Sequence, residues 1–156
     1  GVIAPRHMER CREVEDLIRE FEVEYALLSK QSGLTNCTVL LVDSLGKLNA
    51  FYKSATLTYV GGGFNPRFGG HNILEPAALG KPVLFGKFMN NFEEEAKLLK
   101  QSEGGLQLQN IEVLHDVLKR LLMNPDERQK LSQSAEKTVK ANSGALRKNI
   151  ELIRST

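Results

Sequence analysis

The stretch VGGGFNPRFGGHNILEPAALGKPVLFG, residues 60–86, decides the fold. It leaves an apolar run, passes through a glycine-rich loop, enters a helical pattern and ends in a second apolar run. Strand, loop, helix and strand in this order form the βαβ unit of a parallel sheet. The loop matches neither the GxGxxG fingerprint nor a P-loop, because no GK[ST] follows its last glycine. The sequence therefore disfavours nucleotide binding by those two routes.

The same alternation of apolar runs and helical patterns extends along the whole chain. We predict strands at 2–4, 23–28, 38–42, 57–60, 82–85 and 106–108. Apolar residues recur at spacings of three and four in three stretches, 8–21, 45–52 and 114–122. Asn110 is the expected N-cap of the last of these, a final helical region follows Pro125 with a break at 141–144, and 30–38 is the loosest loop. The pattern predicts an α/β fold with a doubly wound, mainly parallel sheet, in a single domain over residues 1–156.

Composition excludes several classes of protein. The chain has 21 basic and 19 acidic residues, and this balance argues against a nucleic-acid partner held by bulk charge. Cys11 and Cys37 lack a paired spacing, which is typical of reduced thiols in a cytosolic setting. No apolar run approaches the roughly 20 residues that span a bilayer, and the N-terminus has no signal-peptide pattern. We therefore expect this chain to be a soluble domain.

Unusual polar residues gather where the predicted strands end. Residues 5–7 follow the first strand, 43–47 the third, the glycine-rich loop the fourth and 86–96 the fifth. Ligands of open parallel sheets bind outside the carboxyl ends of the strands. Four loops from four strand ends are therefore expected to meet on one rim.

The glycine-rich loop carries the most specific chemistry. A helix is expected to begin near Asn72, and the unpaired amides at a helix N-terminus attract anions. Arg67 and His71 would add charge or hydrogen-bond donors. Glu75 has a carboxylate that can accept two hydrogen bonds from vicinal ribose hydroxyls. Structural explanations remain open: Glu75 as a capping partner, His71 as a surface residue and the glycines as a plain turn.

The other strand-end residues also have structural explanations. Arg6 and His7 can be a solvated pair, although an arginine can donate two hydrogen bonds to a phosphate group. Asp43 and Ser44 suit an N-cap for the helix that follows them. The carboxylates at 93–95 suit a solvated first helical turn, and because no histidine accompanies them we assign no metal site.

Four segments in this order, APRHMER, DSLGKLNAFYKSATLTYVGGGF, GGHNILEPAALGKPVLFG and NNFEEEAKLL, resemble one known family. They are similar to the carboxyl-terminal half of the 3-deoxy-D-manno-octulosonic acid (Kdo) transferases of Gram-negative lipopolysaccharide synthesis. The similarity covers nearly the whole chain, and GGHNxLEP after a VGG strand end is its most specific part. The resemblance implies a GT-B glycosyltransferase, in which two Rossmann-like domains face each other across a cleft. This chain would be the domain that binds the sugar nucleotide, CMP-Kdo.

The resemblance also assigns the donor-binding residues. Those near the phosphate and nucleotide are Pro5, Arg6, His7, Leu45, Gly46, Lys47, Gly70, His71, Asn72, Ile73, Leu74, Glu75 and Asn91. Within this set Glu75 is the implied ribose partner, Asn72 lies near the phosphate and Asn91 lies beside the donor pocket.

The implied reaction transfers Kdo from CMP-Kdo to a lipid A precursor, with inversion and without a metal or cofactor. The catalytic base of the family is a glutamate of the N-terminal domain, which also holds the acceptor-binding surface and a membrane-associating segment. We expect that domain and the leading strand of this one to be absent, so that the chain has no catalytic residue and is inactive alone. The whole enzyme would work at the cytoplasmic face of the inner membrane.

Three alternatives use the same residues. One is the nucleotide-sugar half of another GT-B enzyme that takes a UDP-sugar. The second is a receiver-like or other doubly wound binding module without catalysis, although Arg6 and His7 stand where a receiver has acidic residues. The third is a structural domain whose glycines serve only tight turns.

Overall fold

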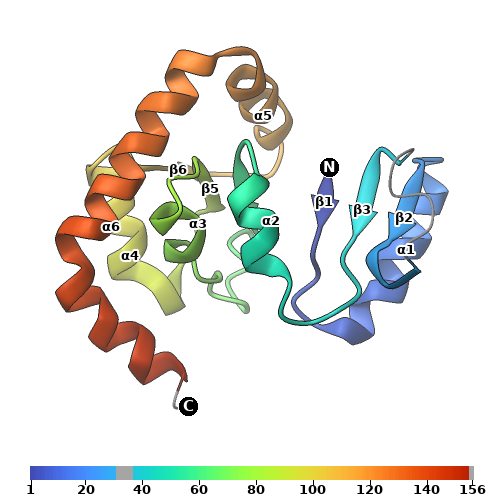
Figure 1. The fold of residues 1–156 in the computed structure, drawn as a ribbon, viewed down its shortest axis with the longest axis horizontal. Coiled ribbons are helices and arrows are strands. Elements are labelled where there is room, and N and C mark those ends of the chain that lie inside the picture. The colour runs from blue at the N-terminus through green and yellow to red at the C-terminus, as the bar shows by residue number, and fades with distance from the viewer. Residues whose placement is uncertain (31–36, 155–156) are drawn as a thin grey trace. The chain divides into compact units, whose positions relative to one another are not determined.

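The computed structural model describes residues 1–30 and 37–154, so most of the loop expected at 30–38 lies outside it. The chain divides into two compact units, Gly1–Phe51 and Tyr52–Thr156 (Figure 1). The boundary between the two units falls within helix α2 (Leu48–Ser54). Each unit is built on its own three-stranded parallel sheet.

The first unit holds the strands β1 (Val2–Ile3), β2 (Tyr25–Leu27) and β3 (Val39–Leu41) in the order β1-β3-β2. Leu41 of the central strand pairs with Ile3 on one side and Leu27 on the other, so the carboxyl ends of all three strands lie at one edge. The 3₁₀ helix η1 (Met8–Arg10) and helix α1 (Cys11–Glu20) connect β1 to β2, and the 3₁₀ helix η2 (Leu28–Lys30) follows β2.

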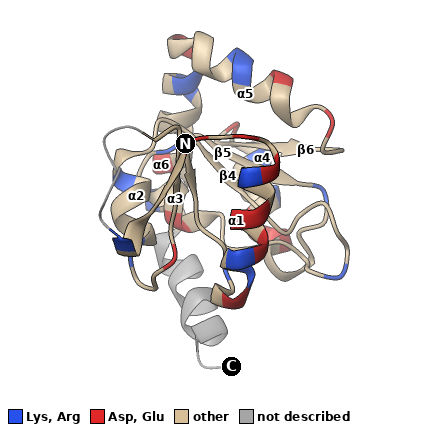
Figure 2. Ribbon diagram, turned by 90° about the vertical axis from the view of Figure 1, so that its right-hand side faces the viewer, with Lys and Arg blue, Asp and Glu red and all other residues tan. Residues whose placement is uncertain are grey.

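Helix α1 forms where its apolar periodicity predicts, yet only part of the expected apolar face is covered. Ile18 is buried, whereas Leu17 and Phe21 are exposed. The polar side of the helix carries acidic and basic residues side by side (Figure 2), including an Arg19–Glu15 ion pair of 2.6 Å. Charges spaced by four residues stabilise a helix locally.

The second unit holds the strands β4 (Thr58–Val60), β5 (Val83–Gly86) and β6 (Gly105–Leu108), in that order and all parallel. Its helices are α3 (Leu74–Ala78), α4 (Glu93–Gln101), α5 (Leu114–Met123) and α6 (Pro125–Arg154), with the 3₁₀ helix η3 (Asn90–Phe92) before α4. Helix α6 packs along α3 and α4 (Figure 1).

Strand β5 is buried on both faces. Its alternating side chains divide between two apolar clusters: Val83 and Phe85 pack among residues that include Ile73 and Leu99, and Leu84 packs with Leu121. Successive side chains of a strand point to opposite faces, so helices must cover both sides of this sheet. This is the doubly wound arrangement that the sequence predicts, and the α/β class and the parallel strands are confirmed.

All six predicted strands are present, and the differences lie at the helix ends. Helix α2 begins at Leu48 rather than at 45, and α5 begins at Leu114, one turn after Asn110, whose side chain accepts a hydrogen bond from the Val113 amide at 3.3 Å. The break expected at 141–144 is wrong, because α6 continues to Arg154. A single glycine within a helix costs only about 1 kcal/mol. The single domain over 1–156 as a nucleotide-sugar-binding unit stays a prediction.

The N-cap role expected of Asp43 is also wrong. Its carboxylate accepts hydrogen bonds from the Ser29 amide at 2.9 Å and the Ser29 hydroxyl at 2.5 Å. Asp43 follows β3 and Ser29 follows β2, so the pair joins the ends of two neighbouring strands. Partial burial raises the pKa of Asp43, but the bonds from Ser29 outweigh this effect and the net pKa is lowered.

Asp43→Ala should lower the free energy of unfolding at pH 7 by about 0.5–1.5 kcal/mol, because two hydrogen bonds are lost and water can reach the exposed Ser29 donors. A carboxylate with a lowered folded-state pKa stabilises the protein above its unfolded pKa and loses this contribution as the pH falls below about 4. The variant should therefore be closer to the wild type at pH 3 than at pH 7 in urea denaturation. Asp16→Ala, an exposed aspartate of α1, is the control and should change little; equal losses for both variants would contradict the assignment.

Candidate functional site

The loops that follow β4 and β5 are bonded to one another. The Phe88 amide donates to the Gly63 carbonyl at 2.8 Å, and the Asn91 amide donates to the Gly69 carbonyl at 3.0 Å. The Asn91 side chain adds a third bond, from Nδ2 to the Phe68 carbonyl at 3.0 Å. Because β4 and β5 are neighbours in a parallel sheet, these bonds hold the two loops together at the carboxyl ends of the strands. The prediction that strand-end loops meet is confirmed for this pair of loops.

Two glycines allow this contact. A β-carbon on Gly63 would lie 2.8 Å from the backbone nitrogen of Gly86 and 2.9 Å from its α-carbon. A β-carbon on Gly86 would overlap the Gly63 carbonyl in turn. The two main chains therefore approach more closely than any side chain permits. The glycines have a packing function here, which the sequence alone did not separate from a turn function.

His71 lies against the bare backbone of Gly62. A β-carbon on Gly62 would lie 3.1 Å from Nε2 of His71, and the histidine is half-buried. Gly70, directly before it, is buried, and its amide donates to the Gly62 carbonyl at 3.3 Å. His71 is thus part of a folded loop and not an ordinary surface residue.

Asn72 and Glu75 form a local pair at the start of α3. The Asn72 side chain accepts from the Leu74 amide at 3.0 Å and donates to Glu75 Oε1 at 3.2 Å. Helix α3 begins at Leu74 and has only five residues, two positions later than expected. The Leu74 amide is occupied by Asn72, so the amides of this short helix are a weaker anion site than the sequence predicted. Ile73 and Leu74 have buried side chains, which leaves their backbone as the part that can face a ligand.

Glu75 keeps hydrogen-bonding capacity in this arrangement. Asn72 holds one of its carboxylate oxygens, and an ionised carboxylate has about four acceptor positions. The pairing resembles a cap, since Glu75 lies three residues after Asn72, but the contact joins two side chains rather than a side chain and an amide. The cap and the ribose-binding role are therefore compatible.

Tyr52 is a neighbour of Glu75 that the sequence analysis missed. Burial and then the negative charge of Glu75 raise the pKa of Tyr52 to about 12. The sequence pattern marked Tyr52 only as one of the apolar positions of a helix. Tyr52 and Glu75 are 23 positions apart in the sequence, and no short motif around either residue predicts that they lie close together.

The remaining predicted residues belong to the first unit. Pro5, Arg6 and His7 follow β1, and Leu45, Gly46 and Lys47 follow β3, its neighbour in the sheet, so both groups leave the same sheet edge. Arg6, His7 and all three residues of the second group are exposed, and Gly46 has a φ of +77° that favours glycine. Residues 70–75 and Asn91 lie in the second unit. A single rim built from both units stays a prediction.

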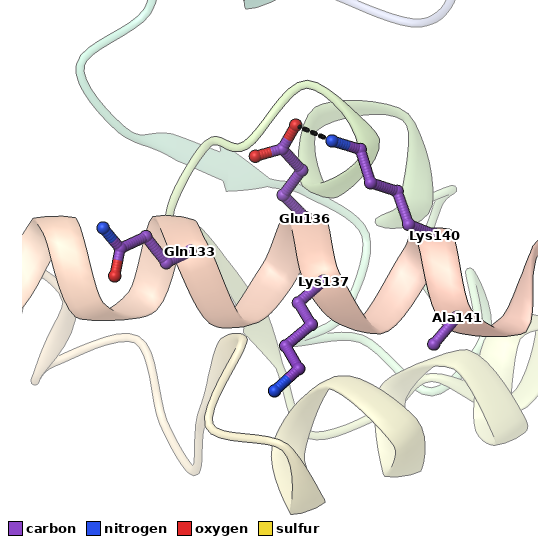
Figure 3. Close-up of a pocket in the computed structure, with 5 residues that line it drawn as sticks. All are labelled: Gln133, Glu136, Lys137, Lys140 and Ala141. Carbon is purple, nitrogen blue, oxygen red and sulfur yellow. Dashed lines mark hydrogen bonds and ion pairs between the residues drawn. The ribbon is translucent and has the colours of Figure 1, made fainter.

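Other candidate sites carry none of the predicted residues. The hollow in Figure 3 has a volume of about 530 Å³ and is lined by Gln133, Glu136, Lys137, Lys140 and Ala141, all from α6. Within residues 1–30 and 37–154, no three histidine, cysteine or acidic side chains are placed to hold a metal ion. Over the same residues no helix has the length and apolar character to cross a membrane.

Comparison with known proteins gives a consistent set of relatives. The 3-deoxy-D-manno-octulosonic acid transferase of Chlamydia pneumoniae is 33% identical over 151 residues, which cover 97% of this chain and 35% of that protein. The enzyme of the same name from Haemophilus influenzae is 31% identical over 155 residues. This chain thus spans about a third of the length of the curated relatives it matches. No family model matches.

A solved structure from another bacterium is similar over most of the chain. It is the C-terminal CMP-Kdo binding domain of WaaA from Acinetobacter baumannii, with a TM-score of 0.83 and 30% sequence identity. The similarity covers 88% of this chain and 72% of that one.

Gly63→Ala should destabilise the second unit by about 1–3 kcal/mol, because the new methyl group meets the Gly86 main chain. Gly61→Ala is the matched control: no atom lies within 4 Å of its added β-carbon, and we expect its stability to be unchanged. Thermal and urea denaturation of both variants measures the difference. Equal stability of the two would refute the close packing of these loops.

Tyr52 should ionise only near pH 12 in an absorbance titration, with Tyr52→Phe identifying its share of the signal. Glu75→Gln should lower this pKa while burial still holds it above 10, because burial is the larger cause. A tyrosine with a raised folded-state pKa favours the folded state until the pH passes the unfolded value. Stability should therefore fall between about pH 10 and 12 in the wild type and fall less in Tyr52→Phe. If Glu75→Gln leaves the pKa of Tyr52 unchanged, the charge of Glu75 does not act on Tyr52 and the assignment is wrong.

Proposed function

Because this chain belongs to the 3-deoxy-D-manno-octulosonic acid transferase family, we propose that it is the donor-binding domain of such an enzyme and binds CMP-Kdo. The observation that carries the proposal is the loop from Gly69 to Glu75. This loop is fixed by Asn91 at the carboxyl edge of a parallel sheet, where open α/β folds bind their ligands. The similarity to a CMP-Kdo binding domain supports the same assignment.

The residues divide into a ribose group and a phosphate group. Glu75, oriented by Asn72, accepts hydrogen bonds from the ribose hydroxyls of the cytidylate. Arg6, Lys47 and the donor groups of Asn72 bind the phosphate. Pro5, His7, Leu45 and Gly46 shape the backbone beside it, and Gly70, which packs against Met89, fixes the main chain ahead of Asn72.

The phosphate group also has a catalytic consequence. When the bond between the sugar and CMP breaks, negative charge develops on the departing phosphate. Positive side chains at that position stabilise the transition state more than the ground state. Since α3 is short and its Leu74 amide is occupied, we assign this stabilisation to Arg6 and Lys47 rather than to a helix dipole.

The complete reaction needs parts that lie outside these residues. Kdo is transferred with inversion to a lipid A precursor, and a carboxylate base of a second domain removes the proton of the acceptor hydroxyl. Neither a metal nor a cofactor takes part. The whole enzyme acts at the cytoplasmic face of the inner membrane, and this chain alone binds the donor without catalysing transfer.

Titration with CMP, followed by amide NMR, tests the proposal. We expect the amides of Gly46 and Asn72 to shift at up to millimolar CMP, and UDP to compete much less well. Glu75→Gln should weaken CMP binding about tenfold, as expected for a lost charge-assisted hydrogen bond, and keep its melting temperature because glutamine still accepts from Asn72. Glu136→Gln, which changes an ion-paired glutamate of α6, is the control and should bind as the wild type does.

Two results would oppose the proposal. An absence of shifts at Gly46 and Asn72 with millimolar CMP would remove the nucleotide site. Equal or tighter binding of UDP would indicate a glycosyltransferase domain with a different donor.

A further inference from the structure

Glu95, in the first turn of α4, is a buried acidic residue that the proposed function does not use. Its exposed fraction is 5%, and no other acidic or basic residue is buried in the part of the chain whose side chains the structure describes. For the carboxylates at 93–95 the sequence predicted a solvated turn. Glu93 and Glu94 are exposed as expected, but the prediction is wrong for Glu95.

The carboxyl group of Glu95 has no partner among residues 1–30 and 37–142. It takes part in none of the side-chain hydrogen bonds or ion pairs of these residues. Leucines occupy the positions three and four residues further along α4, where a basic residue could form a local ion pair. Glu15 and Glu136, by contrast, each pair with a basic residue four positions further on. Glu95 is thus buried without the compensation that other glutamates of this chain have.

The first turn of α4 is therefore docked less firmly than the rest of the helix. Among the described residues, Thr58 Oγ1 is the fully enclosed side-chain polar atom that lacks a partner, so the carboxyl group of Glu95 keeps the slight solvent contact of its residue. A buried polar group without a hydrogen bond costs free energy, which is regained when the group reaches water. Phe92, Ala96 and Leu99 belong to an apolar cluster and oppose the opening. The balance favours a local opening of this turn over opening of the whole unit.

The same turn holds the loop that follows β4. Asn91 lies four residues before Glu95, in the 3₁₀ helix η3, which runs directly into α4. The Asn91 side chain donates to the Phe68 carbonyl at 3.0 Å, and the Asn91 amide donates to the Gly69 carbonyl at 3.0 Å. Both bonds depend on the position of one residue, so displacement of the turn breaks both and frees this part of the loop.

We propose that the start of α4 is a latch: Glu95 allows this turn to open, the opening releases the loop after β4, and a ligand at this sheet edge holds the latch closed. The ligand step rests on the proposed function, in which residues 70–75 and Asn91 bind a cytidylate. A ligand that binds only the closed form shifts the equilibrium toward that form. The buried carboxyl group thus serves entry and release of the ligand and lowers the stability of the unit.

Hydrogen exchange of backbone amides, followed by NMR on this chain, measures the opening. Glu95→Met has a side chain of similar length without the carboxyl group. It should raise the melting temperature and slow exchange of the Asn91 amide about tenfold relative to that of Phe88. The Phe88 amide is the internal reference, because its bond to the Gly63 carbonyl lies outside the turn. Glu95→Gln, which keeps a polar group, should have a smaller effect. Glu94→Met is the matched control at an exposed position and should change neither rate.

CMP tests the ligand step in the wild type. At a CMP concentration ten times its measured Kd, exchange of the Asn91 amide should slow about tenfold, because opening then requires the ligand to leave. The Kd is measured separately by calorimetry on the same chain.

Several results would overturn the inference. The latch is refuted if Glu95→Met lowers the melting temperature or leaves the Asn91 rate unchanged. Equal slowing of Asn91 and Phe88 would indicate a change in the whole unit and would also refute it. If CMP binds and the Asn91 rate stays the same, the inference fails while the donor-binding function stands. If CMP does not bind, the proposed function fails together with the ligand step, and the comparison of Glu95→Met with Glu94→Met alone decides whether the turn opens.

Discussion

The main chains of Gly63 and Gly86 lie against each other with no room for a side chain on either. This contact fixes the distance between the loops that follow β4 and β5, and the hydrogen bond from Phe88 to the Gly63 carbonyl closes it. The placement of Asn91 against Gly69 depends on it, and so does the path of the chain into Asn72 and Glu75. A cleft residue can orient a ligand only if its own position is fixed, and here the positions derive from two adjoining backbones.

In both units a side-chain hydrogen bond joins two neighbouring loops at the carboxyl edge of the sheet. In the first unit Asp43, which follows β3, binds Ser29, which follows β2. In the second, Asn91, which follows β5, binds the Phe68 carbonyl in the loop that follows β4. In each case a polar side chain of one loop bonds the neighbouring loop, so that loops that would otherwise move independently form one surface. Such preorganisation reduces the entropy lost when a ligand binds.

Much of the fold could be predicted from the sequence because its signals are local. Apolar runs located all six strands, and the spacing of three between Asn72 and Glu75 indicated their pairing. The errors concern contacts between distant positions. Nothing near Asp43 shows that Ser29 will take its carboxylate, and nothing near Tyr52 shows that it will lie by Glu75. The break expected at 141–144 failed because local propensity is weak compared with the rest of a thirty-residue helix. For the site, the sequence located the loops and the family resemblance supplied the residue roles, whereas the bond from Asn91 to Phe68 required the fold.

Strand β5, enclosed on both faces and flanked on both edges, has a dynamic consequence for the residues beyond it. Its amide protons can exchange with solvent only when the surrounding unit opens as a whole, whereas loop amides exchange through small local excursions. Asn91 therefore lies five residues after a strand whose amide protons are expected to exchange more slowly than those of the loops. Small motions that accompany ligand binding at this edge are therefore expected in the turns rather than in β5.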